Sequence, residues 1–201
     1  MHPRIRPTFS RNCIIWAMGP GKVIFEGKTS KGAQITIRYP KADDLADLLA
    51  YINTLSAERT FISFQGEQLT EEKEKKFLDS ILEKISKGED VHLLAFSNNQ
   101  LIGVANVSPR ERNAKHTARF GISIAKEFRH VGIGRLLMEK VLAEAKKNLS
   151  GLKTITLDVF ANNSTAIQMY KKFGFKQYGL LPEGVVHQNE FIDKILMYKN
   201  V

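Results

Sequence analysis

Arg129-His130-Val131-Gly132-Ile133-Gly134 joins a predicted strand at about 116–124 to a predicted amphipathic helix. A strand that turns this sharply into a helix leaves backbone N–H groups unpaired at the positive end of the helix dipole. Gly132 and Gly134 let the backbone approach an anion closely, and Arg129 adds a forked cationic donor. These residues therefore predict an anion site, with a purely structural tight turn as the alternative.

The helix after this loop has its apolar side chains on one face, at Ile133, Leu136, Leu137, Val141, Leu142 and Ala145. Thr154 to Phe160 then reads as a second strand. A strand, a helix and another strand in this order usually form a parallel pair with a right-handed crossover. We therefore expect the strands at 116–124 and 154–160 to be parallel neighbours.

Further elements are predicted on both sides of this unit. Alternating residues from Gln34 to Pro40 indicate a strand, and Asn98-Asn99 indicates the turn of a hairpin between 92–97 and 100–108. Helices are predicted from Asp43 or Asp44 to about Leu55, from Thr70 to Gly88 and from Ser164 to Phe173, and a last strand from Glu190 to Tyr198. The fold class is therefore mixed α/β (α+β).

Two common phosphate-binding loops do not fit the glycine pair. A Walker loop requires Gly-Lys-Ser/Thr, whereas Gly134 is followed by Arg135 and Leu136. A dinucleotide fingerprint requires a third glycine at Leu137 and an acid at the end of the next strand, whereas Asp158 lies inside that strand. A nicotinamide-dependent enzyme is accordingly the weaker alternative.

Arg129-x-x-Gly-x-Gly at the start of a helix resembles the pyrophosphate motif of the GNAT (Gcn5-related) N-acetyltransferases. Leu157-Asp-Val-Phe-Ala-Asn-Asn-Ser-Thr-Ala-Ile-Gln-Met-Tyr-Lys-Lys-Phe-Gly-Phe175 resembles the second cofactor motif of that family. The segment at 179–197 looks most like the phosphinothricin and ribosomal-protein acetyltransferase branches. The resemblance implies a central mixed sheet of about six to seven strands flanked by about four helices, and acetyl-CoA as the cosubstrate.

The same resemblance assigns roles to individual residues. It implies that backbone groups of Ile122 and Ile124 pair with the pantetheine arm, and that Asn163 and Tyr170 border its sulfur end. The small side chain of Ala166, which lies between these two polar residues, leaves room for a ligand. The resemblance also implies a pyrophosphate site formed by Arg129, His130, Val131, Gly132, Ile133, Gly134 and Arg135. From spacing alone, positions 163, 166 and 170 share one helix stripe. A helix cap at Asn163 and a core aromatic at Tyr170 are the structural alternative.

One departure from the family pattern concerns the general base. Many relatives carry a glutamate on the strand before the loop, where Arg119 stands here. Glu58, Glu111 and His187 could reach an acceptor from loops, but each is expected on the solvated surface, so we assign no base. Tyr170 is the predicted acid for the departing thiolate. Without a base, α-amino groups near pKa ~8 are favoured as acceptors over lysines near ~10.4.

Composition limits the partners. The 201 residues carry a net charge of +9, and residues 1–33 hold six basic residues and one acid among several prolines and glycines. We interpret 1–33 as a basic arm or hairpin ahead of an acetyltransferase domain at 34–201. A non-catalytic module that binds nucleic acid or an acidic partner is the alternative function, although only Phe9, Trp16 and Phe25 interleave with the basic residues as stacking aromatics.

The remaining expectations concern location and metals. No apolar run approaches the ~20 residues that cross a bilayer, so a cytoplasmic protein without membrane contact is expected. Cys13 is the single cysteine and no Cys/His cluster is present, so no metal is expected. The identity of the acceptor amine and a possible homodimer stay open.

Overall fold

The computed structural model describes residues 18–29, 32 and 34–201, so most of the predicted arm lies outside the described residues. The strands are β1 (Val23–Lys28), β2 (Gln34–Arg38), β3 (Val91–Ser97), β4 (Gln100–Pro109), β5 (Thr117–Ile124), β6 (Thr154–Phe160), β7 (Lys176–His187) and β8 (Glu190–Asn200). The helices are α1 (Leu45–Ala57), α2 (Glu71–Ser86), α3 (Ile133–Asn148) and α4 (Ser164–Lys172), with short 3-10 turns at η1 (Ala42–Asp44), η2 (Arg112–Ala114) and η3 (Lys126–Phe128). The predicted mixed α/β class and the four helices are confirmed.

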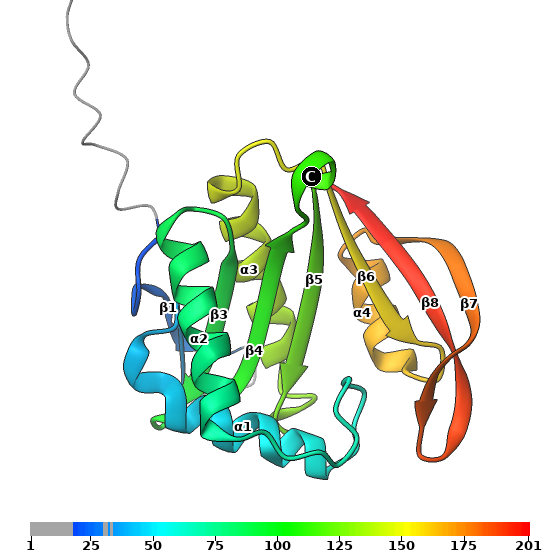
Figure 1. Cartoon of the computed structure of the whole chain (residues 1–201), viewed down its shortest axis with the longest axis horizontal. Coiled ribbons are helices and arrows are strands. Elements are labelled where there is room, and N and C mark those ends of the chain that lie inside the picture. The colour runs from blue at the N-terminus through cyan, green and yellow to red at the C-terminus, as the bar shows by residue number, and fades with distance from the viewer. Residues whose placement is uncertain (1–17, 30–31, 33) are drawn as a thin grey trace, which may run out of the picture.

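The eight described strands form one sheet in the order β1-β2-β3-β4-β5-β6-β8-β7. Every neighbouring pair is antiparallel except β5 and β6, which are parallel as predicted. Helices α1 and α2 lie on one face of the sheet, and α3 and α4 lie on the other (Figure 1). The β5-α3-β6 unit is therefore the centre of the fold.

The sheet has more strands than the six to seven that were predicted. β1 lies in the segment assigned to the arm, yet it pairs with β2 from Val23 opposite Arg38 to Lys28 opposite Gln34. Met18, which precedes β1, is only 8% exposed and packs in the main core. A division of the chain at Gln34 would therefore cut through the sheet. The other additional strand is β7, which had not been predicted.

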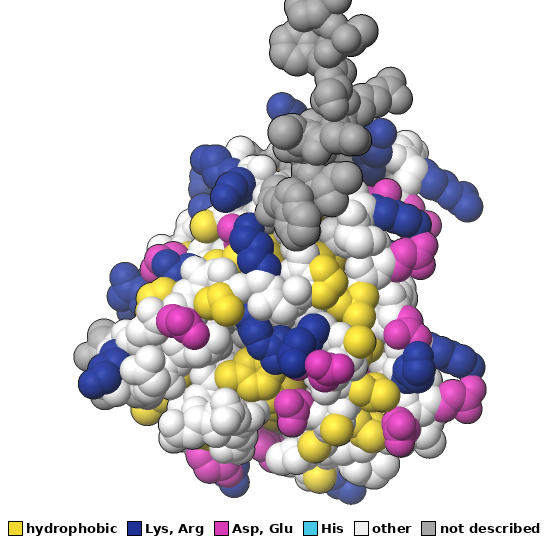
Figure 2. Space-filling model, turned by 90° about the vertical axis from the view of Figure 1, so that its left-hand side faces the viewer, with side chains coloured by type: hydrophobic (Ala, Val, Ile, Leu, Met, Phe, Trp, Pro, Cys, Tyr) yellow, Lys and Arg dark blue, Asp and Glu magenta, His cyan; other side chains and the backbone are white. Residues whose placement is uncertain are grey.

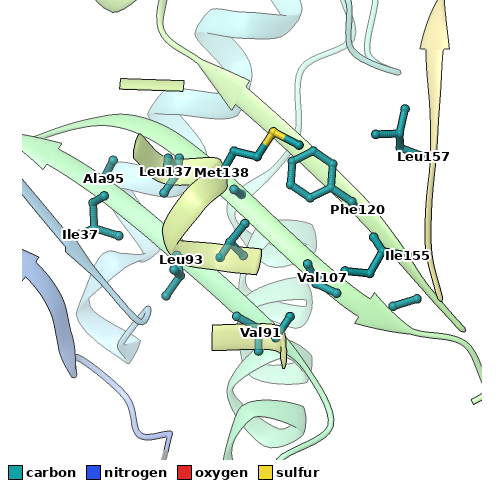
Figure 3. Close-up of a cluster of buried hydrophobic side chains, with 14 of the residues drawn as sticks. Ile37, Val91, Leu93, Ala95, Val107, Phe120, Leu137, Met138, Ile155 and Leu157 are labelled. Atoms are coloured by element: carbon teal, nitrogen blue, oxygen red, sulfur yellow. The ribbon is translucent and has the colours of Figure 1, made fainter. Parts of the chain in front are cut away.

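The hydrophobic pattern explains how the sheet is covered. β3 is buried along its whole length because it lies between helices on both faces. Val91, Leu93 and Ala95 belong to the core under α3, and Leu94 and Phe96 belong to a second core with α1 and α2. Figure 3 shows the first of these cores, whose labelled members are Ile37, Val91, Leu93, Ala95, Val107, Phe120, Leu137, Met138, Ile155 and Leu157.

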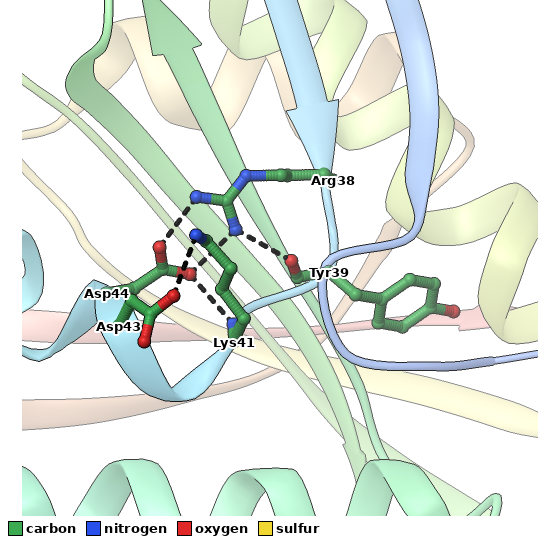
Figure 4. Close-up of polar contacts among 5 residues, drawn as sticks. All are labelled: Arg38, Tyr39, Lys41, Asp43 and Asp44. Carbon is green, nitrogen blue, oxygen red and sulfur yellow. Dashed lines mark hydrogen bonds and ion pairs between the residues drawn. The ribbon is translucent and has the colours of Figure 1, made fainter.

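An ion pair fixes the entrance to α1. Arg38 donates to both carboxylate oxygens of Asp44, at 2.7 and 2.6 Å, and Asp44 also accepts the Lys41 N–H at 2.8 Å (Figure 4). The Arg38 guanidinium lies 4.3 Å from the centre of the Phe96 ring. A hollow of about 540 Å³ borders this corner, at the β1 edge of the sheet and therefore several strands away from β6. The corner thus orients α1, whose other end reaches the site described below.

The described surface carries both signs of charge. On the face at the β1 side of the molecule, Lys and Arg side chains alternate with Asp and Glu (Figure 2). Such mixing gives that face no continuous basic track of the kind that follows a nucleic-acid backbone. Among the described residues, no helix is both long enough and apolar enough to cross a bilayer.

Two ionisable side chains are buried at the start of β3. Asp90 and His92 are each 5% exposed, and Asp90 Oδ1 and His92 Nε2 have no hydrogen-bond partner in the described structure. Burial raises the pKa of Asp90 to about 6 and lowers the pKa of His92 to about 4. Each shift disfavours the charged form, so the two groups affect acid stability with opposite signs.

We expect single variants of Asp90 and His92 to change the pH dependence of the free energy of unfolding in opposite directions. Folded Asp90 holds its proton up to about pH 6, so its contribution to stability falls as pH rises from about 4 to 6. Folded His92 resists protonation down to about pH 4, so its contribution rises as pH rises from about 4 to 6.5. In Asp90→Asn the free energy of unfolding should therefore rise more steeply with pH than in the unaltered protein. In His92→Phe it should rise less steeply, or fall. Over this pH range each substitution should change the rise by ~2–3 kcal/mol.

Urea unfolding at pH 4, 5, 6 and 7 measures both slopes. Other titrating groups are shared by the two variants and cancel in their difference. Parallel pH profiles for the two variants would contradict this assignment.

Candidate active site

The parallel strands β5 and β6 are paired only at their beginnings. Thr117, Ala118 and Arg119 lie opposite Thr154, Ile155 and Thr156, and no later residues of the two strands are paired. Figure 1 shows the strands diverging toward their carboxyl ends. We call the space between the unpaired ends of β5 and β6 the wedge.

Backbone groups of Ile122 and Ile124 face the wedge. The hydrogen bonds from Ala125 N to Ile102 O and from Arg110 N to Thr117 O show that odd-numbered positions of this segment bond toward β4. Because neighbouring residues of a strand direct their backbone groups to opposite sides, the even-numbered residues face β6. The Ile122 N–H and C=O and the Ile124 N–H therefore lack a strand partner and line the wedge.

The loop before α3 presents further free donors. His130 and Gly132 have φ values of 62° and 90°, and Gly132 is the N-cap of α3 without a side-chain cap. Within the described residues, the N–H groups from Val131 to Arg135 have no backbone acceptor, and the helix ladder begins with Leu136 N to Gly132 O at 3.1 Å. This helix end is therefore suited to bind an anion, as predicted from the sequence.

The Arg129 side chain is used differently from the prediction. Its Nη2 donates to Glu58 Oε2 at 2.6 Å and its Nε donates to Ile124 O at 2.9 Å. The guanidinium thus ties the end of β5 to the end of α1 instead of standing free as a phosphate donor. The backbone of the loop is the part that remains available to an anion.

Helix α4 brings the second predicted group to the wedge. A Cβ on Gly134 would lie 3.7 Å from Ile124 Cγ1 and 3.8 Å from Met169 Sδ, so the loop, β5 and α4 meet at this glycine. Asn163 caps α4, because its Oδ1 accepts the Ala166 N–H at 3.1 Å. The capping role raised as the structural alternative for Asn163 is therefore present in the structure.

Tyr170 is largely buried beside β5. Its ring centre lies 5.9 Å from that of Phe120, edge to face, and 6.1 Å from that of Phe175. Burial raises the pKa of Tyr170 to about 12, so its hydroxyl is protonated at neutral pH. The hydroxyl oxygen is not among the fully buried unpaired atoms of the described structure, and no hydrogen bond within it uses this oxygen. It is therefore free to donate to a bound molecule.

The segment that contains the loop before α3 and helix α4 matches a known protein family. The family model described as acetyltransferase (GNAT) family matches residues 55–175. The chain belongs to the GNAT acetyltransferase family. The motifs at the loop and at α4 both lie inside the matched range, so the resemblance inferred from them is confirmed.

Three relatives illustrate the match. An acetyltransferase of the GNAT family from Streptococcus pneumoniae is 31% identical, with a TM-score of 0.76 over 83% of this chain and 99% of that one. The L-amino acid N-acetyltransferase AaaT of Escherichia coli is 28% identical over 106 residues, 52% of this chain and 65% of AaaT. The ribosomal protein bS18-alanine N-acetyltransferase of Escherichia coli is 27% identical over 121 residues, 60% of this chain and 64% of that protein. The chain thus spans just under two thirds of these two curated relatives.

The GNAT site of this chain departs from the family pattern at Arg119. Arg119 Nη2 donates to Asp158 Oδ2 at 2.8 Å across the start of the wedge, and Lys194 Nζ lies 3.6 Å from the same oxygen. The carboxylate of Asp158 is therefore held by two cations within the sheet. Neither residue supplies the missing base.

Two of the three candidate loop residues are not on the solvated surface. Glu111 is exposed, as expected. The Glu58 side chain is only 16% exposed and pairs with Arg129. His187 is 5% exposed, with Nε2 3.1 Å from Arg59 O and Nδ1 3.4 Å from Asn162 Nδ2. The expectation of surface positions was wrong for Glu58 and His187, because contacts over long sequence separations bury both.

A hollow of about 240 Å³ opens beside the carboxyl ends of β5 and β6. Arg129 connects it to β5 through Ile124 O, and His187 connects it to β6 through ring contact with Phe160 at 5.5 Å. We call it the mouth hollow, and its lining includes Glu58, Arg59, Phe61, Lys126, Arg129 and His187. It adjoins the wedge at the end where the two strands are farthest apart.

Proposed function

We propose that this GNAT protein is an acetyl-CoA-dependent N-acetyltransferase that acts on an α-amine. The observation that carries the proposal is the wedge, where Ile122 and Ile124 present unpaired backbone groups beside the free N–H groups at the start of α3. A cosubstrate with an amide-bearing arm and a pyrophosphate complements both features.

The residues present fit that cosubstrate. Backbone N–H and C=O groups in the wedge can pair with the amides of a pantetheine arm as an added strand would. The N-terminus of α3 can hold the pyrophosphate through N–H groups and the helix dipole, and Gly134 has no side chain in that approach. When bound, acetyl-CoA supplies an acetyl thioester that a neutral amine can attack.

The protein's contribution to the reaction is orientation and proton handling. The N–C bond to the acetyl group forms as the C–S bond breaks, the amine releases its proton, and the thiolate takes one up. We assign the second proton to the Tyr170 hydroxyl, which lies at the wedge without a partner among the described residues. Holding amine and thioester in reach of each other lowers the barrier further.

The acceptor class follows from the absence of an available base on β5. Arg119 occupies the expected place of an acid and is paired with Asp158. The α-amino group of a peptide, with a pKa near ~8, is partly neutral at physiological pH without assistance, whereas a lysine near ~10.4 is not. The names of the two curated relatives specify an L-amino acid and an alanine of ribosomal protein bS18 as the acceptors of those proteins.

Acetyl-CoA is expected to raise the melting temperature of the full-length protein, and NADH is not. A ligand at 100 times its Kd adds about 2.7 kcal/mol to the folded state, which in a chain of this size corresponds to a rise of roughly 5–10 °C. Differential scanning fluorimetry measures the shift, and thiol release over a panel of amines measures the activity. Stabilisation by NADH together with none by any CoA compound would exclude the proposed function.

A further inference from the structure

We propose that the mouth hollow binds the carboxylate of the acceptor, so that free α-amino acids with apolar side chains are the preferred substrates. The inference rests on the proposed acetyltransferase function and narrows its acceptor.

The lining of the mouth hollow is positively charged. Arg59, Lys126 and Arg129 contribute three cations, and Glu58 contributes the one carboxylate. Glu58 is already paired with Arg129 at 2.6 Å. Among the described residues, neither Arg59 nor Lys126 has an acidic partner within ion-pair distance. Lys126 and Arg59 therefore add positive charge to the lining of a hollow that a carboxylate could enter, although Arg59 also interacts with Glu67 at longer range.

The wall of the hollow is held in place by contacts between distant segments. His187 at the end of β7 meets Arg59 O at 3.1 Å, and its ring lies 4.6 Å from the Phe61 ring. Phe61 in turn meets Phe160 at the end of β6, edge to face at 5.8 Å. These contacts hold the loop after α1 in place, so the backbone at Arg59 is positioned without a ligand.

Phe61 supplies the apolar part of the site. Its ring is 39% exposed, although it contacts two other rings, so part of it remains open to solvent. An apolar or aromatic side chain could cover this area while its own carboxylate meets the cations. The hollow is therefore suited to a molecule that carries both groups on one carbon, as an α-amino acid does.

The position of the hollow places such a substrate next to the acetyl donor. Arg129 Nε is bonded to Ile124 O at the end of β5, and Lys126 follows that strand in η3. A carboxylate held by Lys126 and Arg59 would leave the α-nitrogen, two bonds away, near the open end of the wedge. The N–C bond forms where this amine meets the thioester, with loss of the C–S bond and release of the thiol.

The test compares free phenylalanine with phenylalaninamide as acceptors in steady-state thiol release. The amide keeps the α-amine and side chain but removes the negative charge, and its amine loses a proton more readily, so any chemical bias favours the amide. We expect kcat/KM for the free amino acid to exceed that for the amide by about 10-fold or more, the effect of one charged hydrogen bond.

Variants of Lys126 test whether its positive charge binds the acceptor carboxylate. Lys126→Ala should raise the KM for phenylalanine by about 10-fold while the KM for acetyl-CoA and the rate with the amide stay unchanged. Lys126→Arg should restore most of the loss. Lys147→Ala removes the same charge from the last turn of α3 and serves as the matched control, with no change expected.

The outcomes separate the two levels of the proposal. Equal use of phenylalanine and its amide by the unaltered protein overturns the carboxylate site and leaves the acetyltransferase intact. A Lys126→Ala effect on acetyl-CoA instead of the acceptor also overturns it, because Lys126 would then serve the cosubstrate. Failure to release thiol with any amine overturns the proposed function itself.

Discussion

Replacing Tyr170 with phenylalanine is expected to lower kcat by roughly 10²–10⁴-fold, the usual contribution of general acid catalysis. The substitution removes one hydroxyl and keeps the ring, which packs edge to face on Phe120 at 5.9 Å. Stability and the Kd for acetyl-CoA should therefore change little. Single-turnover kinetics with a good acceptor measures the chemical step directly.

Tyr178 provides the matched control for Tyr170. Its side chain is 57% exposed on β7, so Tyr178→Phe removes a hydroxyl at a site without a proposed role and should leave kcat unchanged. Nearly full kcat in Tyr170→Phe, with chemistry rate-limiting, would mean that the thiolate takes its proton from water. Tyr170 would then be a core aromatic only.

Gly134→Val is expected to weaken acetyl-CoA binding by about 100-fold, which corresponds to the loss of two charged hydrogen bonds. A Cβ at this position meets Ile124 and Met169 at ordinary contact distances of 3.7 and 3.8 Å, so the fold should tolerate a side chain. The two valine methyl groups, however, would occupy the approach to the free N–H groups of the loop. Calorimetric titration measures the Kd, and the melting temperature without ligand reports on the fold.

Gly134→Ala should weaken acetyl-CoA binding less than Gly134→Val does, because alanine adds only one methyl group. Gly132 makes a less informative variant, since its φ of 90° strains any side chain and would lower stability together with binding. An unchanged Kd in Gly134→Val would show that the loop is a structural turn.

Local patterns accounted for most of the elements. The hairpin was predicted from Asn98-Asn99, and both residues adopt positive φ, 48° and 63°. The start of α2 was predicted at Thr70, whose side chain accepts the Lys73 N–H. β7 was missed although the same kind of signal was present, since Gln188 and Asn189 between two β-rich runs also adopt positive φ, 55° and 68°. That strand could have been found with the rule applied to the first hairpin.

The polar contacts of the site could not be predicted in this way. Glu58 and Arg129 are 71 residues apart, and His187 and Arg59 are 128 residues apart. Each pair forms because the sheet order brings the end of α1 and the β7–β8 turn to the same end of the wedge. Sequence spacing reports on neighbours along one element, so it predicted a loop with free N–H groups before α3 but neither the partner of Arg129 nor the burial of His187.

The short seam between β5 and β6 has a mechanical consequence. Only three residue pairs join the two strands, and Phe120 of β5 packs beside them against Tyr170 of α4 and Phe175 in the turn after α4. Elsewhere, two strands can change their spacing only by breaking a ladder of hydrogen bonds. Here the aromatic side chains set the distance between β5 and β6. A single substitution among them can therefore widen or narrow the wedge while all backbone hydrogen bonds between strands stay intact.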